Sequence, residues 1–186
     1  MLQYRRKLPH FHPEGGYLFL TWRLWGSLPA KPPSHLYSTP GQAFLAADRT
    51  LHRGCTGPLW LKDSRIAQVV VEAIVAGERE RSFYELFARV VMPNHVHLLV
   101  QPKVAVPEIT RWLKGSTARR ANQLLGRTGR PFWRDEAYDH WVRNTKEFER
   151  IYRYIEENPV SAGLVGSAEL WPWSSASGQA EPPAPH

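Results

Sequence analysis

The segment from His95 to Val100 places polar histidines and aliphatic residues in alternation, a pattern that predicts a β-strand. Successive side chains of a strand point to opposite faces, so His95 and His97 share one face. Val96, Leu98 and Val100 share the other face and would pack on a core. The two histidines would therefore stand side by side on a rigid surface.

Two more segments are rich in aromatic and β-branched residues, which predicts strands. One runs from Tyr17 to Leu24 and the other from Tyr84 to Val91. Pro93-Asn94 makes a tight turn between the second of these and the histidine strand, so the two strands should form a hairpin.

Three segments carry apolar residues at helical spacing, over about 64–76, from Pro107 onward, and over the stretch before Pro159. Cap and stop residues bound them. The starting residues are Asp63, Pro107 and Asn144 with Glu147 three positions on, and the ending residues are Gly77, Gly126 and Pro159. A shorter helix is predicted over Gly41–Arg53, in the region 30–60, to which the pattern assigns no chemistry.

The order strand, helix, strand, strand, helix predicts an α+β fold. We expect a split β-α-β arrangement, with an antiparallel sheet and helices on one face. A fourth strand should lie near Pro131–Arg143. Residues 1–175 form one domain, and the Ser-, Ala-, Gly- and Pro-rich composition from Ser174 onward predicts disorder, with 176–186 as a tail.

Charge and composition limit the classes of molecule that this chain is expected to bind. The chain has 24 Lys and Arg against 17 Asp and Glu, a formal charge of +7, which favours nucleic acid first and an acidic membrane surface second. The single cysteine, Cys55, excludes an internal disulfide and an all-cysteine zinc site. Neither a signal peptide nor an apolar run of about 20 residues is visible, so we expect a soluble, cytoplasmic protein.

Basic residues concentrate between Lys103 and Arg134, where Glu108 is the one acid. Such a run is either a solvated face or a surface for a phosphate backbone. The candidate DNA contacts are Lys103, Arg111, Lys114, Arg119, Arg120, Arg127, Arg130 and Arg134.

The histidine pair has two interpretations. Polar residues on the wet face of a half-buried strand are common, but two neighbouring imidazoles can also hold a metal ion. Tyr154 and Asn158 lie four residues apart on the last helix, about 40° apart around its axis. Tyr154 taken alone would most simply be a core residue.

Three motifs in order resemble the single-tyrosine, single-strand DNA transposases, specifically their REP-associated branch. They are Met92-Pro93-Asn94-His95-Val96-His97-Leu98-Leu99, Phe132-Trp133-Arg134-Asp135 with Tyr138-Asp139-His140, and Tyr154-Ile155-Glu156-Glu157-Asn158-Pro159. The resemblance covers about residues 15–175, and 30–60 looks like an insertion of a subgroup. It implies a ferredoxin-like (RRM-like) fold, a divalent metal held by His95, His97 and Asn158, and Tyr154 as nucleophile.

The resemblance implies an endonuclease and strand-transferase that acts on single-stranded hairpin DNA as a monomer or homodimer. Mg²⁺ or Mn²⁺ would serve, and the imidazole ligands favour tighter binding of Mn²⁺. Tyr138 is a weak rival nucleophile, whereas Tyr152 projects into the apolar stripe.

Two other functions remain open from the sequence. One is a module with an RRM-like fold that binds a DNA or RNA hairpin without cutting it. The other is a zinc-dependent hydrolase that uses His95 and His97, although no third His, Cys or carboxylate stands at a helpful spacing.

Overall fold

The computed structural model describes residues 2–5, 9–12, 15–28, 40–53 and 57–178. Cys55, the loop around Lys31-Pro32-Pro33 and the tail from Gln179 to His186 lie outside these ranges. The elements in chain order are β1 (Leu2–Arg5), β2 (Pro9–His12), β3 (Leu18–Arg23), α1 (Pro40–Arg53), the 3-10 helix η2 (Trp60–Lys62), α2 (Ser64–Arg79), β4 (Tyr84–Val91), β5 (His95–Pro102), α3 (Val106–Leu124), β6 (Tyr138–Trp141), α4 (Thr145–Glu156), α5 (Asn158–Ser161) and the 3-10 helix η3 (Ala168–Leu170).

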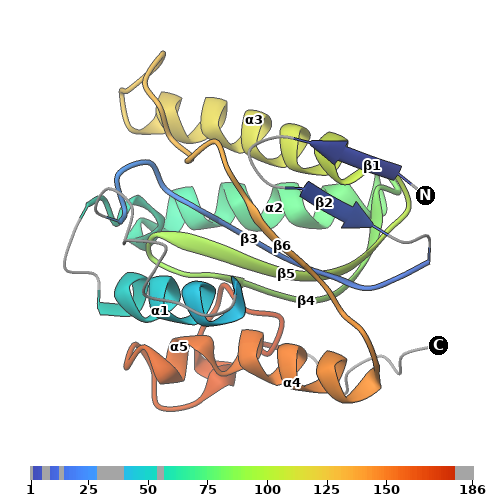
Figure 1. The fold of residues 1–186 in the computed structure, drawn as a ribbon. Coiled ribbons are helices and arrows are strands. Elements are labelled where there is room, and N and C mark those ends of the chain that lie inside the picture. Colours follow the sequence, from blue (N-terminus) through green and yellow to red (C-terminus); the bar gives the residue numbers. More distant parts are fainter. Residues whose placement is uncertain (1, 6–8, 13–14, 29–39, 54–56, 179–186) are drawn as a thin grey trace.

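The central sheet has four antiparallel strands in the order β4-β5-β3-β6 (Figure 1). The elements β3-α2-β4-β5-α3-β6 give the ferredoxin-like βαββαβ order, which confirms the predicted fold class. The fourth strand lies within the predicted segment and pairs with β3, Thr21 opposite Tyr138. A separate hairpin, β1 with β2, was not anticipated from the sequence.

Helices cover both faces of the sheet. Val96, Leu98 and Val100 belong to the core formed with α2 and α3, as the alternation predicts. Leu99 lies in a second core with Phe148 and Ile155 of α4, on the face that carries the histidines. The prediction of helices on one face is therefore incomplete, because α1 and α4 lie across the sheet from α2 and α3 (Figure 1).

Local capping chemistry sets the helix starts. Asp63 accepts a hydrogen bond from the backbone N–H of Arg65 at the start of α2, and Asn144 accepts one from Glu147 at the start of α4. The predicted stop at Gly77 is wrong, since α2 continues to Arg79.

The C-terminal segment is partly ordered, contrary to the prediction of disorder from Ser174. Ser174 and Ser175 are buried, and Ser174 forms an isolated antiparallel bridge with Val90 of β4. The backbone N–H of Ser175 donates to the carbonyl of Arg89 at 2.9 Å.

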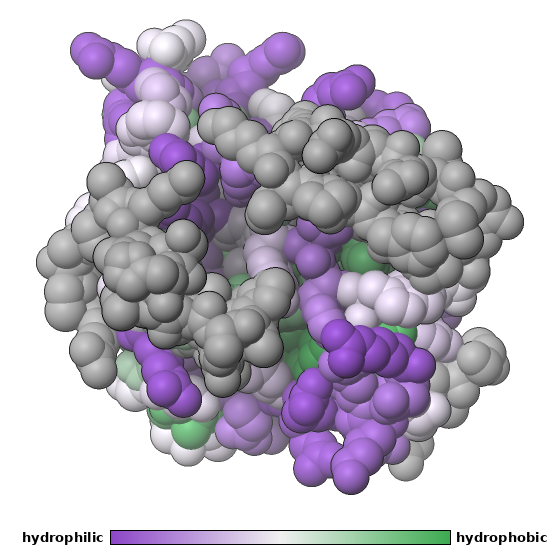
Figure 2. All heavy atoms as spheres, viewed as in Figure 1, coloured by the Kyte–Doolittle hydropathy of each residue, from purple (hydrophilic) through white to green (hydrophobic). Residues whose placement is uncertain are grey.

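The outer surface of α4 is solvated. Figure 2 shows hydrophilic side chains gathered at the lower right, over this helix. In the described parts of the chain, no helix combines the length and apolar character needed to cross a membrane.

Candidate metal centre and nucleophile

The two histidines of β5 are buried on the face that α1 and α4 cover, each with 0% of its surface exposed. This confirms that they share a strand face and excludes the interpretation of a wet face. Across the strand pair, the hydroxyl of Thr21 lies 2.7 Å from Nδ1 of His97. Nδ1 is thereby engaged, and Nε2 is directed elsewhere.

A chain of contacts orients His95 in the same manner. The side-chain N–H of Asn94 donates to the carbonyl of Leu51 in α1, at 3.0 Å. The amide oxygen of Asn94 is then free to accept from Nδ1 of His95, at 2.6 Å. With its proton on Nδ1, His95 keeps a lone pair on Nε2, the form in which imidazole binds a metal.

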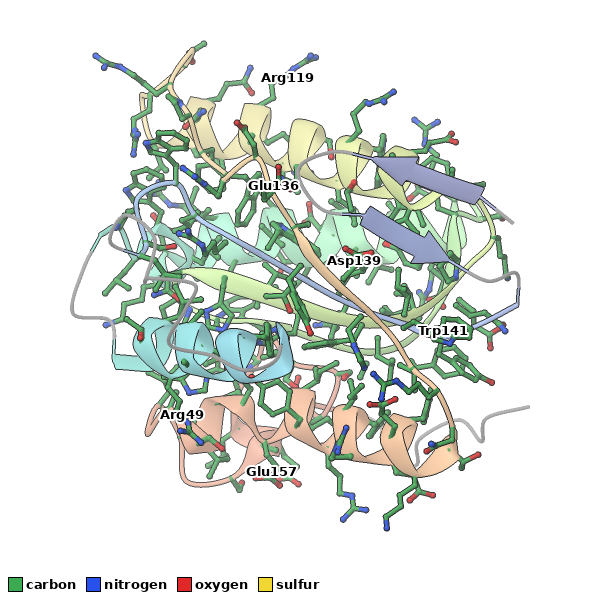
Figure 3. The ribbon with its side chains drawn as sticks, in the orientation of Figure 1. Arg49, Arg119, Glu136, Asp139, Trp141 and Glu157 are labelled. Carbon is green, nitrogen blue, oxygen red and sulfur yellow. The ribbon has the colours of Figure 1, made fainter. Side chains whose placement is uncertain are left out.

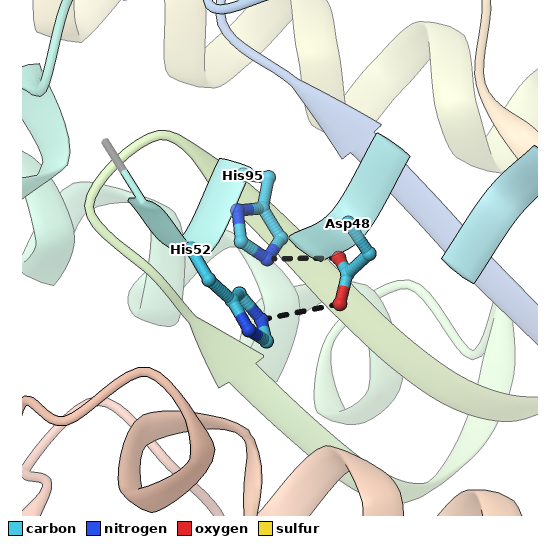
Figure 4. Close-up of side chains that lie close together, drawn as sticks. All are labelled: Asp48, His52 and His95. Atoms are coloured by element: carbon cyan, nitrogen blue, oxygen red, sulfur yellow. Dashed lines mark ion pairs between the residues drawn. The ribbon is translucent and has the colours of Figure 1, made fainter. Parts of the chain in front are cut away.

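Asp48 of α1 reaches between the histidines with a side chain that is 3% exposed. Its Oδ1 lies 3.2 Å from Nε2 of His97 and 3.4 Å from Nε2 of His95. In Figure 4, dashed lines join Asp48 to His95 and to His52, a second residue of α1. Asp48, His52 and His95 form a group that could hold a metal ion.

The other carboxylate oxygen of Asp48 faces the last helices. Oδ2 accepts a hydrogen bond from the hydroxyl of Tyr154. Nε2 of His52 lies 3.1 Å from both Oδ2 of Asp48 and Oδ1 of Asn158. Tyr154 and Asn158 thus adjoin the histidine pair, with the rings of His97 and Tyr154 centred 5.6 Å apart.

Burial and neighbouring charges shift the pKa values of these groups. Burial and the adjacent His97 hold the pKa of His95 well below its usual value, so His95 is neutral at pH 7. Burial alone would raise the pKa of Asp48, but the surrounding histidines lower it, so Asp48 is ionised. Burial and the charge of Asp48 raise the pKa of Tyr154, which keeps its proton.

The donor set fits a divalent cation. Oδ1 of Asp48, Nε2 of His95 and Nε2 of His97 are buried, and none has a hydrogen-bond partner among the described residues. Buried polar atoms are normally satisfied, so three donors without partners that face one another are suited to a shared ion. The side-chain nitrogen of Asn158 is also without a partner in the described chain.

The three candidate nucleophiles Tyr138, Tyr152 and Tyr154 lie in different surroundings. Tyr152 is buried in the core with Phe148. Tyr138 stacks on Phe44 of α1, with ring centroids 4.4 Å apart, at the margin of the same strand face. Among these three tyrosines, Tyr154 donates to Asp48.

Sequence reasoning missed Asp48 and His52, because the region 30–60 was given no chemistry. A signal was present: the helix predicted over Gly41–Arg53 places an aspartate and a histidine one turn apart on one face. Because Asp48 and His52 lie beside His95, the argument that a zinc site lacks a third ligand no longer holds.

Four of the predicted basic residues, Arg111, Lys114, Arg119 and Arg120, lie on α3, across the sheet from this cluster. Arg119 lies on α3 and Arg49 on α1, on opposite sides of the sheet (Figure 3). Arg120 forms an ion pair with Glu72 of α2 at 3.0 Å, and Lys114 donates to the carbonyl of Asp135. Lys103, Arg111 and Arg130 are exposed, whereas Arg127 and Arg134 are half-buried.

A positively charged cluster of Arg23 and Arg134 lies where β3 ends. Arg23, opposite His95 in the sheet register, has its pKa lowered by burial and by the charge of Arg134. The guanidinium of Arg134 lies 5.2 Å from the ring centre of Trp25, which is 43% exposed. Within the described ranges, neither arginine has a carboxylate within ion-pair distance.

Comparison with known proteins assigns the family. The model of the family described as "Transposase IS200 like" matches residues 61–158, just over half of the chain. These residues include His95, His97, Tyr154 and Asn158, and they begin after α1.

Individual relatives agree with that match. A REP-associated tyrosine transposase of Escherichia coli (strain K12) is 30% identical over 109 residues, 58% of this chain and 63% of that protein. A relative from Haemophilus influenzae is 28% identical over 105 residues, 50% of this chain and 58% of that protein. The matches thus span less than two thirds of the length of either relative.

A solved structure, of a REP-associated tyrosine transposase bound to a REP hairpin, has the same fold. Its TM-score is 0.59 at 24% identity, and the superposition covers 94% of this chain and 82% of that one. With the histidine strand, the tyrosine helix and the family match in agreement, this chain belongs to the IS200-like transposase family.

Proposed function

We propose that this protein is a divalent-metal-dependent endonuclease and strand-transferase that acts on single-stranded palindromic hairpin DNA. One observation carries the proposal: the hydroxyl of Tyr154 shares a buried cluster with Nε2 of His95 and Nε2 of His97. A reactive hydroxyl beside a metal-ligand set is what phosphodiester attack requires.

In the proposed reaction, Oη of Tyr154 forms a bond to the phosphorus of a phosphodiester, and the bond from phosphorus to the 3′ oxygen breaks. The hydroxyl proton departs along the hydrogen bond to Asp48. The leaving 3′ oxygen gains a proton and becomes a hydroxyl. A phosphodiester is exchanged for a 5′-phosphotyrosine, so a later 3′-hydroxyl can rejoin strands without ATP.

His95 and His97 would hold the metal, with Asn158 as a further oxygen donor. A bound Mn²⁺ or Mg²⁺ would polarise the scissile phosphate and orient it for in-line attack. Thr21 and Asn94 keep the two imidazoles turned so that each Nε2 faces the site.

We propose hairpin DNA as the substrate because the E. coli relative is a REP-associated transposase and this chain carries a net charge of +7. The cluster of Arg23, Arg134 and Trp25 would receive the strand that leads to the site. Two crowded guanidiniums attract a phosphate, and the exposed indole offers a surface on which a base can stack.

The test is a search for a covalent protein–DNA adduct on denaturing gels, after incubation with a labelled hairpin oligonucleotide and Mn²⁺. The parent protein, Tyr152→Phe and Tyr138→Phe should form the adduct. Tyr154→Phe should not, because it loses only the attacking hydroxyl.

Two outcomes would contradict the proposal. An adduct that survives in Tyr154→Phe would identify another nucleophile. Hairpin binding by the parent protein without any adduct, on the palindromes that flank its own gene, would favour a binding module.

A further inference from the structure

The geometry points to Asp48 as a metal ligand: α1 contributes a carboxylate to the centre formed by His95 and His97, in a segment that precedes the family match. This inference rests on the proposed function, which assigns a metal to the two histidines. It adds an anionic ligand to a set otherwise made of neutral groups.

The distances agree with donors that share one ion. Metal bonds of about 2.1 Å place neighbouring donors about 3.0 to 3.4 Å apart. Oδ1 of Asp48 is 3.2 Å from one imidazole Nε2 and 3.4 Å from the other. The two imidazoles come from one rigid strand, so a carboxylate from another element can close the set without rearranging the sheet.

The hydrogen bonds around Oδ1 of Asp48 and the two Nε2 atoms leave these three atoms available to bind one ion. Nδ1 of His97 is engaged by Thr21, and Nδ1 of His95 by Asn94, so both Nε2 atoms are directed at Oδ1. All three atoms are buried without a hydrogen-bond partner in the part of the chain that the structure describes. A cation held in this dry site would be attracted by the carboxylate oxygen and by a lone pair of each imidazole.

The carboxylate also joins the metal ligands to the nucleophile. Oδ1 faces the two imidazoles, whereas Oδ2 accepts from the hydroxyl of Tyr154 and lies 3.1 Å from Nε2 of His52. Occupation of the metal site would therefore hold Tyr154 in place through the same side chain. A charged oxygen ligand also favours hard ions such as Mn²⁺ and Mg²⁺ over soft ones.

The first experiment measures Mn²⁺ affinity by isothermal titration calorimetry in the absence of DNA. Asp48→Asn keeps the shape and removes the charge, and it should weaken Mn²⁺ binding tenfold or more. His97→Ala should abolish binding. Asp63→Asn, the same change at a half-buried helix cap outside the cluster, should bind as the parent does.

Unchanged Mn²⁺ affinity in Asp48→Asn, with binding lost in His97→Ala, would overturn the inference and leave the proposed function intact. If Mn²⁺ affinity is unchanged in Asp48→Asn and this variant also forms the covalent adduct faster than the parent, then Asp48 blocks the substrate. That outcome also overturns the inference. A parent protein that binds no Mn²⁺ would contradict the metal site of the proposed function itself.

A second variant covers the case in which Asp48→Asn fails to fold. Asp48→Cys replaces a hard ligand by a thiolate, which prefers Cd²⁺. Its preference for Cd²⁺ over Mn²⁺ should rise at least tenfold over that of the parent, with a thiolate-to-Cd²⁺ charge-transfer band. A ratio and spectrum equal to those of the parent, which already contains Cys55, would overturn the inference.

Discussion

Gly77 of α2 packs directly against the ring and hydroxyl of Tyr84 of β4. The hydroxyl donates to the carbonyl of Ile74 at 2.6 Å, which fixes the tyrosine against the helix. A Cβ at position 77 would fall inside van der Waals contact with that hydroxyl. The glycine is therefore a packing residue within the helix, and its φ is not in the left-handed region that a glycine ending a helix adopts.

Gly77→Ala should accordingly lower the free energy of unfolding by about 1–3 kcal/mol, because the core must shift to admit the methyl group. Gly115→Ala is the matched control, since that glycine lies within α3 and, apart from the neighbouring residues and backbone of its own helix, no atom lies within 4 Å of an added Cβ. It should raise stability by about 0.5–1 kcal/mol. Urea unfolding measures both, and equal shifts in the same direction would contradict this account.

Arg134→Ala should weaken binding of a single-stranded or hairpin DNA oligonucleotide. One lost phosphate contact should flatten the slope of log affinity against log salt by about 0.7. Arg120→Ala should change the slope less, because its guanidinium is already paired with Glu72. Fluorescence anisotropy over a salt series measures both slopes. A larger effect at Arg120 would place the DNA on the outer surface of α3.

Glu147 links α4, which carries Tyr154, to the preceding chain. Its carboxylate accepts from the N–H of Arg143 at 2.9 Å and lies 3.2 Å from Nε2 of His140. Burial opposes ionisation, but the Arg143 hydrogen bond and the His140 interaction outweigh it and lower the pKa of Glu147 below 4.5. Stability from this group is therefore present above pH 4.5 and is lost as pH falls through the lower pKa of the folded state.

Glu147→Gln should thus destabilise the protein by about 1 kcal/mol at pH 7, and the difference from the parent should shrink below pH 4. Thermal unfolding across this pH range is the measurement. Glu149→Gln provides the control, because its 3.9 Å pair with Arg153 is exposed. A difference at Glu147 that grows on acidification would reverse the assigned sign.

Local patterns made most of the fold predictable. The period of two placed His95 and His97 on one face, and the caps at Asp63 and Asn144 depend only on neighbouring residues. The finding that helices cover both faces of the sheet was harder to predict from the sequence. It depends on packing between α4 and a strand face that the alternation alone would leave solvated.

The candidate site was half predictable for a related reason. Tyr154 and Asn158 are joined by one helical turn, so their proximity follows from spacing. Asp48 meets His95 from a distant part of the chain, and no periodicity encodes that contact. Its charge is tolerated in the interior only because three histidines and a tyrosine converge on it.

The C-terminal segment has a consequence for how molecules of this protein meet one another. β4 is an edge strand, and exposed edges invite pairing with a second sheet. Here Trp173 and Ser175 occupy backbone groups of Val91 and Arg89, and the indole of Trp171 donates to the carbonyl of Val91. The chain thereby caps its own edge, and removal of this segment would expose these backbone groups to pairing with the edge of a second molecule.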